Sequence, residues 1–244
     1  MQFSNEQTNY KKSIIVECGF DWKEIIKRAY AQDCSDMLIS ASACLITHGH
    51  QDHCKCAKAI LNSGKDIFAT EETKEASRIE ISGNGTIKPF ETFCIAPKLY
   101  GYPFKVEHDF PNSLGFIIQC QETDETILFV NDCKYFKEDL SNYYFDYIFI
   151  ECNYIDKFTR TIYEKAVKEN DKVKMSQYKR VIDSHMGLER TKKILSSLKM
   201  NRCKGIFLMH LSDRNANEYK MKNEIKYLFP RIPVLVCQRN GGVK

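Results

Sequence analysis

The stretch THGHQDH occupies residues 47–53 and follows directly on the apolar run ACLI. It contains three of the six histidines of the chain, together with one aspartate. Residues two apart in an extended backbone point to the same side, so a strand that ends here presents His48 and His50 together. Asp52 and His53 open the helical pattern DHCKCAKAIL, where the amides of a helix N-terminus favour a carboxylate. The spacing H-x-H-x-D-H can therefore serve two metal ions from a single turn.

Three further residues with metal-binding side chains lie at the ends of predicted strands. His108 stands just before a strand, Asp132 follows the strand ILFVN, and His210 ends the strand GIFLM. A chance histidine cluster on a solvated loop, the alternative interpretation, would leave these residues unexplained. Nitrogen and oxygen ligands suit zinc, with manganese or iron as alternatives. Two such ions make hydroxide available at neutral pH and polarise the bond under attack, which predicts a hydrolase with two divalent ions.

The length of 244 residues allows one large domain or two small ones, and no segment has the composition of a linker, so we expect one domain over residues 1–244. Short apolar runs predict strands at 13–16, 43–47, 66–69, 92–95, 114–119, 126–130, 147–151, 180–183, 205–209 and 234–237. Amphipathic spacing predicts helices at 21–30, 52–64, 188–200 and 215–229. The strands at 92–130 have the pattern of an antiparallel meander, and the later strands alternate with helices. This mixture predicts a layered α/β sandwich with helices outside the sheets.

Composition excludes several classes of protein. Hydrophobic residues make up 43% of the chain and charged residues 28%, and no apolar run approaches the length of about 20 residues that spans a membrane, so we expect no membrane span. The N-terminus lacks the pattern of a secretory signal, which predicts a cytoplasmic protein. The eleven cysteines lie mostly singly in apolar runs and are interpreted as buried small hydrophobic residues, Cys54 and Cys56 included. The net charge of +4 does not by itself predict nucleic-acid binding.

The motif H-x-H-x-D-H, followed in order by His108, Asp132 and His210, resembles the metallo-β-lactamase superfamily over nearly the whole chain. The resemblance implies a four-layer αββα sandwich, with the site at one edge of its two sheets, and two divalent ions that are usually zinc. It also implies which residues bind them: His48, His50 and His108 the first ion, Asp52, His53 and His210 the second, and Asp132 both.

Three segments resemble one bacterial branch of that superfamily, the YycJ-like or WalJ-like hydrolases, which includes DNA exonucleases. They are FIECNY at 149–154, IDSHMGLERTKKIL at 182–195 and HLSDRNAN at 210–217. This resemblance implies a phosphodiester substrate, DNA or RNA, and nuclease or exonuclease action. The substrate contacts that we predict in these segments are Ser184, His185, Ser212, Arg214 and Asn217.

Glu151 and His185 look like the glutamate and histidine pair that ribonuclease Z, a relative on the same fold, uses for proton transfer. We expect Ser184 or His185 at the N-terminus of the helix LERTKKILSSL, where free amides favour a phosphate oxygen. His185 would contact the scissile phosphate or protonate the leaving oxygen, with Glu151 orienting its ring. Together with Asp52 they are the predicted catalytic residues. The alternative is a structural histidine with a hydrogen bond in the core.

Basic residues are frequent in the second half of the chain, and the lysine-rich segment 156–179 is predicted to be a surface excursion or lid. They could guide a polyanion into the site or form an ordinary solvated surface. A small-molecule hydrolase that acts on a cyclic phosphodiester or a thioester is the alternative enzyme, and would have a closed pocket under 156–179. The alternative outside the enzymes is a non-catalytic binding module stabilised by its metal ions.

The N-terminal sequence departs from the family pattern. Members begin with a strand hairpin before the strand that is here SIIVECG, and the chain is expected to lack the usual first strand. Glu17 stands where the family has the aspartate of a D-x-G ending. Loss of an edge strand exposes backbone hydrogen-bonding groups. We therefore expect that the first residues cover this edge, that a neighbouring subunit pairs with it to form an oligomer, or that the protein is shortened.

Overall fold

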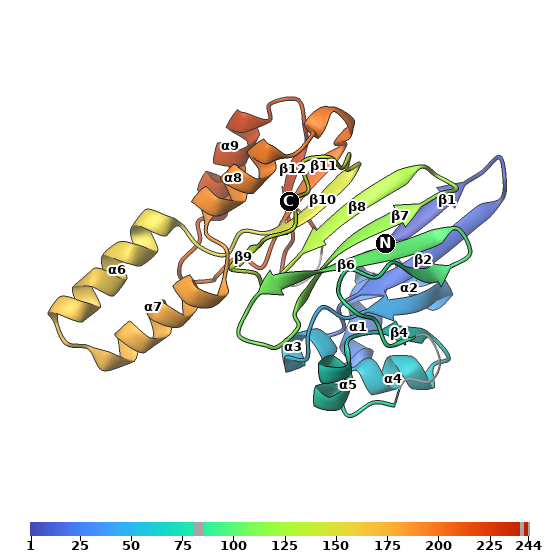
Figure 1. Ribbon diagram of the computed structural model, residues 1–244, viewed down its shortest axis with the longest axis horizontal. Helices are drawn as coiled ribbons and strands as arrows, with labels where there is room; N and C mark the ends of the chain where they lie inside the picture. The colour runs from blue at the N-terminus through green and yellow to red at the C-terminus, as the bar shows by residue number, and fades with distance from the viewer. Residues whose placement is uncertain (81–84, 240–241, 244) are drawn as a thin grey trace. The chain divides into compact units, whose positions relative to one another are not determined.

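The structure, a computed structural model, describes residues 1–80, 85–239 and 242–243, and it divides into two compact units. The first unit comprises residues 1–105 and 110–126, and the second comprises residues 106–109 and 127–244. Helices and strands alternate along the chain and the strands belong to two sheets (Figure 1), which confirms the predicted α/β class.

The first unit begins with a four-stranded sheet in the order β1-β2-β3-β4 and continues into an antiparallel meander. Its strands are β1 (Gln2–Asn5), β2 (Tyr10–Val16), β3 (Ala41–Leu45), β4 (Asp66–Phe68), β5 (Phe93–Ala96), β6 (Leu99–Glu107, whose last two residues belong to the second unit) and β7 (Leu114–Cys120). Its helices are α1 (Trp22–Ala31), α2 (Ser35–Ser40), α3 (Gln51–Cys54), α4 (Ala57–Asn62) and α5 (Glu71–Ser77). Strand β3 is parallel to both of its neighbours, and β6 is antiparallel to β5 and β7, which confirms the predicted meander.

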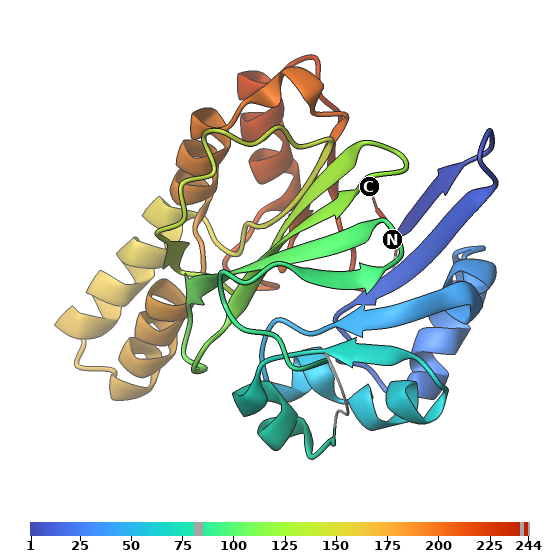
Figure 2. The same cartoon turned by 45° about the vertical axis from the view of Figure 1, so that its right-hand side comes forward.

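A hairpin opens the first unit (Figure 2). Strand β1 pairs with β2 antiparallel, from Gln2 opposite Ser13 to Asn5 opposite Tyr10. Of the three expectations for the edge of the strand SIIV, the first is therefore confirmed, because the first residues of the chain cover this edge. Strand β1 is an edge strand of this sheet, and an oligomer formed through it stays a prediction.

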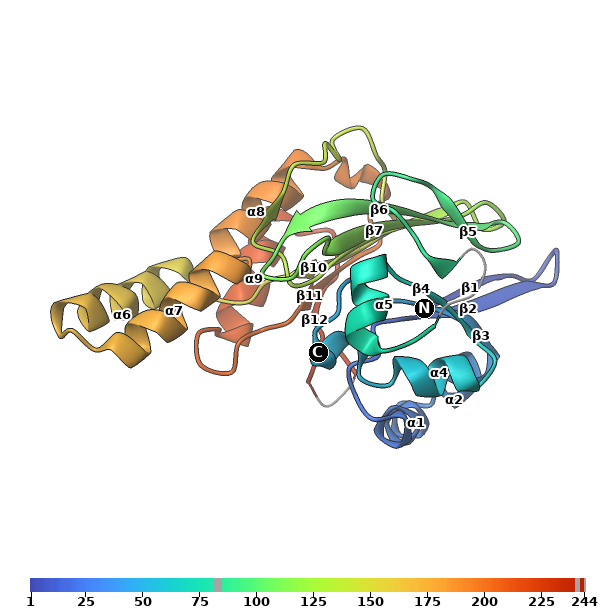
Figure 3. The same cartoon turned by 60° about the horizontal axis from the view of Figure 1, so that its bottom comes forward.

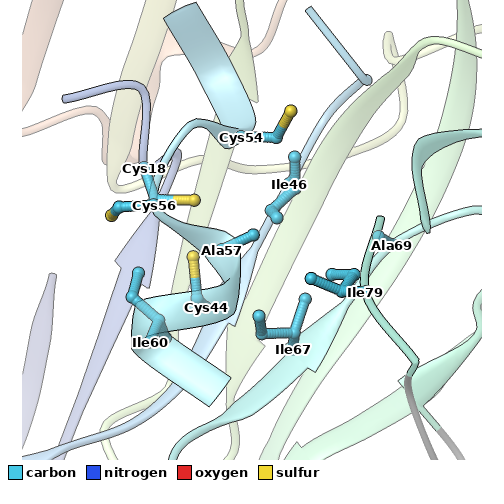
Figure 4. Packing of buried hydrophobic residues seen from close by; sticks show 10 residues of the cluster. All are labelled: Cys18, Cys44, Ile46, Cys54, Cys56, Ala57, Ile60, Ile67, Ala69 and Ile79. Atoms are coloured by element: carbon cyan, nitrogen blue, oxygen red, sulfur yellow. The ribbon is translucent and has the colours of Figure 1, made fainter. Parts of the chain in front are cut away.

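Cysteines contribute a large part of the core of the first unit (Figure 4). Cys18, Cys44 and Cys56 are buried among isoleucines, with Ile60 and Ile67 in the same cluster. Burial raises the pKa of Cys54, and all eleven cysteines are free thiols, seven of them buried. The interpretation of Cys54 and Cys56 as packing residues is thus confirmed, since both belong to this cluster.

Parallel strands form the centre of the second unit, in the order β8-β10-β11-β12. Its strands are β8 (Glu125–Val130), which begins in the first unit, β9 (Tyr135–Phe136), β10 (Tyr147–Glu151), β11 (Gly205–Met209) and β12 (Val234–Val236). Its helices are α6 (Asp156–Lys168), α7 (Lys172–Ser184), α8 (Leu188–Ser197), the 3-10 helix η2 (Met200–Arg202) and α9 (Glu218–Leu228). The rings of Phe149 on β10 and Phe207 on β11 stack with centroids 4.3 Å apart. Parallel pairing puts the carboxyl ends of β8, β10 and β11 at one edge, and Asp132, Glu151 and His210 lie at these ends.

Helices α6 and α7 form a hairpin that projects from the strands of the second unit (Figures 1 and 3). They account for the predicted surface segment 156–179, and the strand predicted at 180–183 is wrong because α7 continues to Ser184. The partly buried residues of α7 include Met175, Tyr178, Val181 and Ile182, a helical spacing, whereas their sequence neighbours on the helix are largely exposed. The β-branched pair at 181–182 suggested a strand, but the helical spacing of the partly buried residues extends through this pair, and the segment is helical.

None of the helices in the described ranges is both long enough and apolar enough to cross a membrane.

Candidate active site

The first unit carries the three histidines of THGHQDH on the segment that leaves β3. His48 and His53 are buried, with ring centroids 4.1 Å apart. The Nε2 atom of His48 lies 3.0 Å from Nδ1 of His50, and its Nδ1 atom lies 2.9 Å from the hydroxyl oxygen of Thr47. Two nitrogen ligands of one tetrahedral zinc ion are about 3.3 Å apart. The structure therefore brings His48 and His50 together at nearly the spacing that one ion requires.

Glu17 holds His53 from the end of β2. Its Oε2 atom lies 2.7 Å from Nδ1 of His53, and its Oε1 atom accepts a hydrogen bond of 3.0 Å from the amide of Thr47. A metal-binding histidine commonly donates its other ring N–H to a carboxylate in this way, which leaves Nε2 of His53 for an ion. The exposed Asp52 carboxylate lies 3.8 Å from that Nε2 atom.

The sequence had suggested Glu17 only as a substitute for an aspartate, and this contact was missed. The parallel pairing of β2 with β3, in which Val16 lies opposite Leu45, is what brings the two strand ends together. One pattern in the sequence could have indicated the contact between Glu17 and His53. Glu17 lies one residue beyond the end of a strand, and the neighbouring strand leads into the histidine motif.

In the second unit, Asp132 joins two histidines from different parts of the chain. Its Oδ1 atom lies 2.8 Å from Nδ1 of His210, and its Oδ2 atom lies 3.7 Å from Nε2 of His108. His108 donates its Nδ1–H to the backbone carbonyl of Ser184 at 3.1 Å, and its Nε2 atom faces two carboxylates, that of Asp109 at 3.0 Å and that of Asp132. Burial lowers the pKa of His108, so the neutral ring that a metal ion requires is favoured.

Glu151, the last residue of β10, is completely buried and connects four donors. Its Oε1 atom accepts from Nδ1 of His185 at 2.8 Å and from Nδ1 of His210 at 3.0 Å. Its Oε2 atom accepts from the backbone amides of Cys133 at 2.6 Å and Met186 at 3.3 Å. Burial alone would raise the pKa of Glu151, but the hydrogen bonds from the two histidines prevail and lower it. An ionised carboxylate is therefore stable in this buried position.

His185 follows the last residue of α7 rather than opening α8. Helix α8 begins at Leu188 after Gly187, and its first amides are already engaged: that of Leu188 with the carbonyl of Tyr154, and that of Glu189 with the carboxylate of Asp156. The predicted phosphate site of free amides at this helix start is therefore wrong. Ser184 is buried at the end of α7, with its carbonyl bound to His108.

The side chain of His185 remains partly accessible, at 17%, although its partner Glu151 is fully buried. Because Nδ1 faces the carboxylate, the ring orientation is fixed and Nε2 is left for a ligand. The structure thus brings together the pair that the sequence suggested for proton transfer.

Two of the predicted substrate contacts in HLSDRNAN have structural partners. The Ser212 hydroxyl oxygen accepts from the amides of Arg214 and Asn215. Asn217 caps α9, since its side-chain oxygen accepts from the amide of Lys220 at 2.9 Å. Arg214 is exposed and borders a cavity of the second unit.

The donor atoms of the second unit suit a divalent cation. One ligand atom from each of Asp132, Glu151, His185 and His210 lies within 4.8 Å of the others. Burial would lower the pKa of His210, but hydrogen bonds with Asp132 and Glu151 outweigh it and raise the pKa to about 10. Two buried carboxylates that hold a proton on one histidine favour a cation at this place, and a metal ion would replace that proton. Because four donors already occupy Glu151, Asp132 and His210 are the better ligands.

The sequence of residues 12–210 matches the family described as the Beta-lactamase superfamily domain. No curated protein matches the chain. The fold is similar to that of a diphosphatase from the PhnP family, with a TM-score of 0.63, 12% identity and coverage of 100% of this chain and 82% of that one.

Two further solved structures are similar. The short form of human tRNase Z (ELAC1) has a TM-score of 0.57 and 14% identity, with coverage of 100% of this chain and 90% of that one. Zn(2+)-bound PqqB from Methylobacterium extorquens has a TM-score of 0.58 and 14% identity, with coverage of 84% and 73%. At these identities the likeness concerns the fold, and it confirms the predicted metallo-β-lactamase fold.

Proposed function

The chain belongs to the β-lactamase superfamily, and we propose that it is a dinuclear metal-dependent hydrolase that cleaves phosphodiesters of DNA or RNA as a nuclease or exonuclease. The proposal includes the YycJ-like branch, which the segments around Glu151, His185 and His210 suggest. When bound, two divalent ions would lower the pKa of water so that a nucleophile is available at neutral pH, and would polarise the phosphate.

The proposed ligands are those that the family pattern implies. We assign His48, His50 and His108 to one ion, Asp52, His53 and His210 to the other, and Asp132 to both. The nitrogen-rich set favours zinc, with manganese or iron as alternatives. Each unit supplies only part of the set, so the proposal treats residues 1–244 as one functional domain.

The observation that carries the phosphodiester proposal is the contact between Glu151 and His185. A buried carboxylate fixes Nδ1 of His185 at 2.8 Å, while the ring keeps an accessible edge. With Nδ1 held by the carboxylate, Nε2 is the ring atom that can donate a proton to the leaving oxygen. An alkoxide leaving group, as in a nucleic acid, depends on that proton.

The alternative substrate is a small phosphate ester or anhydride, and the fold shared with a diphosphatase of the PhnP family supports it. The fold is also shared with tRNase Z, whose name indicates an RNA substrate. Glu151 and His185 would serve both substrates in the same way. A non-catalytic, metal-stabilised module would need no such accessible histidine.

The first test measures metal content by elemental analysis and hydrolysis of two substrates, bis-p-nitrophenyl phosphate and end-labelled DNA, single- and double-stranded, with zinc or manganese supplied. We expect two ions per chain and metal-dependent degradation of DNA, both lost in Asp132→Ala. Cleavage of the small ester alone would favour the small-molecule alternative. Metal binding without turnover on either substrate would favour the non-catalytic module.

A second comparison isolates the role of His185. The p-nitrophenolate ion leaves without a proton, whereas a sugar alkoxide needs one, so His185→Ala should slow DNA cleavage about 100-fold or more and affect the aryl ester much less. Asp132→Ala should abolish both reactions, and Lys193→Ala, an exposed change on α8, serves as the control. Near wild-type DNA cleavage by His185→Ala would show that the proton-transfer role is wrong.

A further inference from the structure

A cavity of 490 Å³ in the second unit lies between the start of α6 and the segment that leads into α9. Lys157 and Phe158 border it on α6, and Arg214, Asn215 and Lys220 border it from the other side. Its size is within the range of small-molecule binding sites, about 300 to 1,000 Å³. No acidic residue is among the described residues that line it, so three cations face a space of ligand size.

The acidic residues next to these cations in sequence are engaged elsewhere. Asp156 accepts a hydrogen bond from the amide of Glu189 at 3.0 Å, and Asp213 pairs with Arg239. Lys220 pairs with Glu224 at 3.8 Å, whereas within the described part of the chain neither Lys157 nor Arg214 has a carboxylate partner. The charges of Lys157 and Arg214 are therefore available to a ligand, and a phosphate would be attracted to them.

The lining also offers an aromatic surface and an unsatisfied amide. Phe158 is 48% exposed, so part of its ring is available to stack on a planar partner. Asn215 is only 6% exposed, and its side-chain oxygen is buried without a hydrogen-bond partner. An unpaired buried amide oxygen is unfavourable, and a donor on a ligand could satisfy it after a small rotation of the side chain.

Hydrogen bonds connect this cavity to the candidate active site within the same unit. The side-chain Nδ2 of Asn153 donates to the backbone carbonyl of His210 at 2.8 Å, and the backbone amide of Ser212 donates to the carbonyl of Asn153 at 2.9 Å. The backbone amide of Ile155 donates to the carbonyl of Asn215 at 2.9 Å. Arg214 is four residues from His210, so the two Cα atoms are at most about 14 Å apart. That distance is short enough for neighbouring nucleotides of one strand.

We propose that this cavity is a nucleotide-binding subsite, in which Arg214 and Lys157 bind a backbone phosphate of a single-stranded substrate and Phe158 stacks on one of its bases. The inference rests on the proposed function and names a substrate contact that the metal ligands do not provide. Base stacking on an aromatic ring and charge pairing with phosphate together are the usual basis of single-strand binding.

A second cavity in the same unit provides a contrast. It lies along α8 and α9 and is bordered by Lys192, Glu224 and Tyr227. Lys192 is bound to Glu224 at 3.0 Å and to Glu189 at 3.1 Å, so its charge is neutralised inside the protein. Tyr227, at 86% exposure, is therefore a matched aromatic control for Phe158.

The test is binding of fluorescein-labelled oligothymidylate by fluorescence anisotropy, with the full chain, a metal chelator present to prevent cleavage, and several salt concentrations. Phe158→Ala should weaken binding about 5-fold or more without changing the salt dependence. Arg214→Ala should weaken binding and also reduce the slope of log affinity against log salt by about 0.7, because one phosphate contact is lost. Tyr227→Ala and Lys168→Ala, an exposed lysine at the far end of α6, should stay within twofold of the wild type.

Any of three results would overturn the proposed subsite. The first is wild-type affinity for the oligonucleotide in both Phe158→Ala and Arg214→Ala, and the second is an equal loss of affinity in the two control variants. The third is no binding of the oligonucleotide by the wild-type protein at low salt. Failure of the proposed function is seen separately, as absence of metal-dependent turnover of bis-p-nitrophenyl phosphate by the wild-type protein. Thermal unfolding of each variant checks that these exposed substitutions leave the fold intact.

Discussion

Glu151→Gln tests whether one buried carboxylate stabilises the second unit as the structure indicates. The carboxylate accepts two hydrogen bonds from histidine rings and two from backbone amides. A glutamine offers one oxygen and one NH₂ group, so at least two of these donors would face another donor. Loss of two charge-assisted hydrogen bonds, at about 1.5–3 kcal/mol each, predicts a decrease of about 3–6 kcal/mol in the free energy of unfolding.

The measurement is urea unfolding at pH 7 with a chelator present, so that metal binding does not contribute. Glu189→Gln is the matched control, since this carboxylate is 62% exposed and binds Lys192 at the surface. We expect the control to change the free energy of unfolding by less than about 0.5 kcal/mol. A decrease of less than about 1 kcal/mol in Glu151→Gln would refute the argument.

Three further predictions concern the first unit. Ile60→Ala should lower the free energy of unfolding by about 2–5 kcal/mol in a urea titration, because Ile60 is completely buried in the cysteine-rich core; a loss below about 1 kcal/mol would contradict this packing. Cys94, which is exposed, should react with iodoacetamide in the native protein long before the buried Cys44 does, as mass spectrometry of peptides can show, and equal rates would be inconsistent with the fold. Hydrogen bonds from its own backbone amide and from Asn112 hold the pKa of Glu72 below its usual 4.5, so their stabilisation is present above pH 4.5 and is lost on acidification. The unfolding midpoint of Glu72→Gln should therefore lie below that of the wild type at pH 7 and approach it near pH 3, and a gap that widens with acid would show the opposite sign.

The sequence alone identifies the candidate metal ligands because their positions follow local periods. His48 and His50 are two apart on an extended segment, His210 directly follows β11, and Asp132 lies two residues beyond the end of β8. Such patterns need no knowledge of distant residues. The same reliance on short patterns caused the wrong assignment of RVID as a strand. A run of four residues with a β-branched pair does not show that it continues the helical spacing of α7.

The contacts that fix the orientation of these side chains could not be predicted in the same way. Glu17 reaches His53 across 36 residues of sequence, and Glu151 reaches His210 across 59. These pairs depend on which strands are neighbours, and no single segment contains that information. Ser212 and Asn217 were predicted as substrate contacts, but their side chains bond to a turn and to a helix start. The type of a polar residue beside a site does not by itself separate substrate binding from such a local structural role.

Backbone conformation explains why Glu151 is central to both stability and site geometry. Asp132 and His210 have φ angles of +44° and +55°, in the left-handed region that costs a non-glycine residue about 1–2 kcal/mol. Each follows the end of a parallel strand, and the turn directs its side chain towards the other, with 2.8 Å between Oδ1 and Nδ1. Hydrogen bonds to Glu151 offset this strain. One comes from the backbone amide of Cys133, the residue after Asp132, and the other comes from the ring of His210. The carboxylate thus holds both strained turns in place, so its removal should disturb the positions of two proposed ligands as well as the ring of His185.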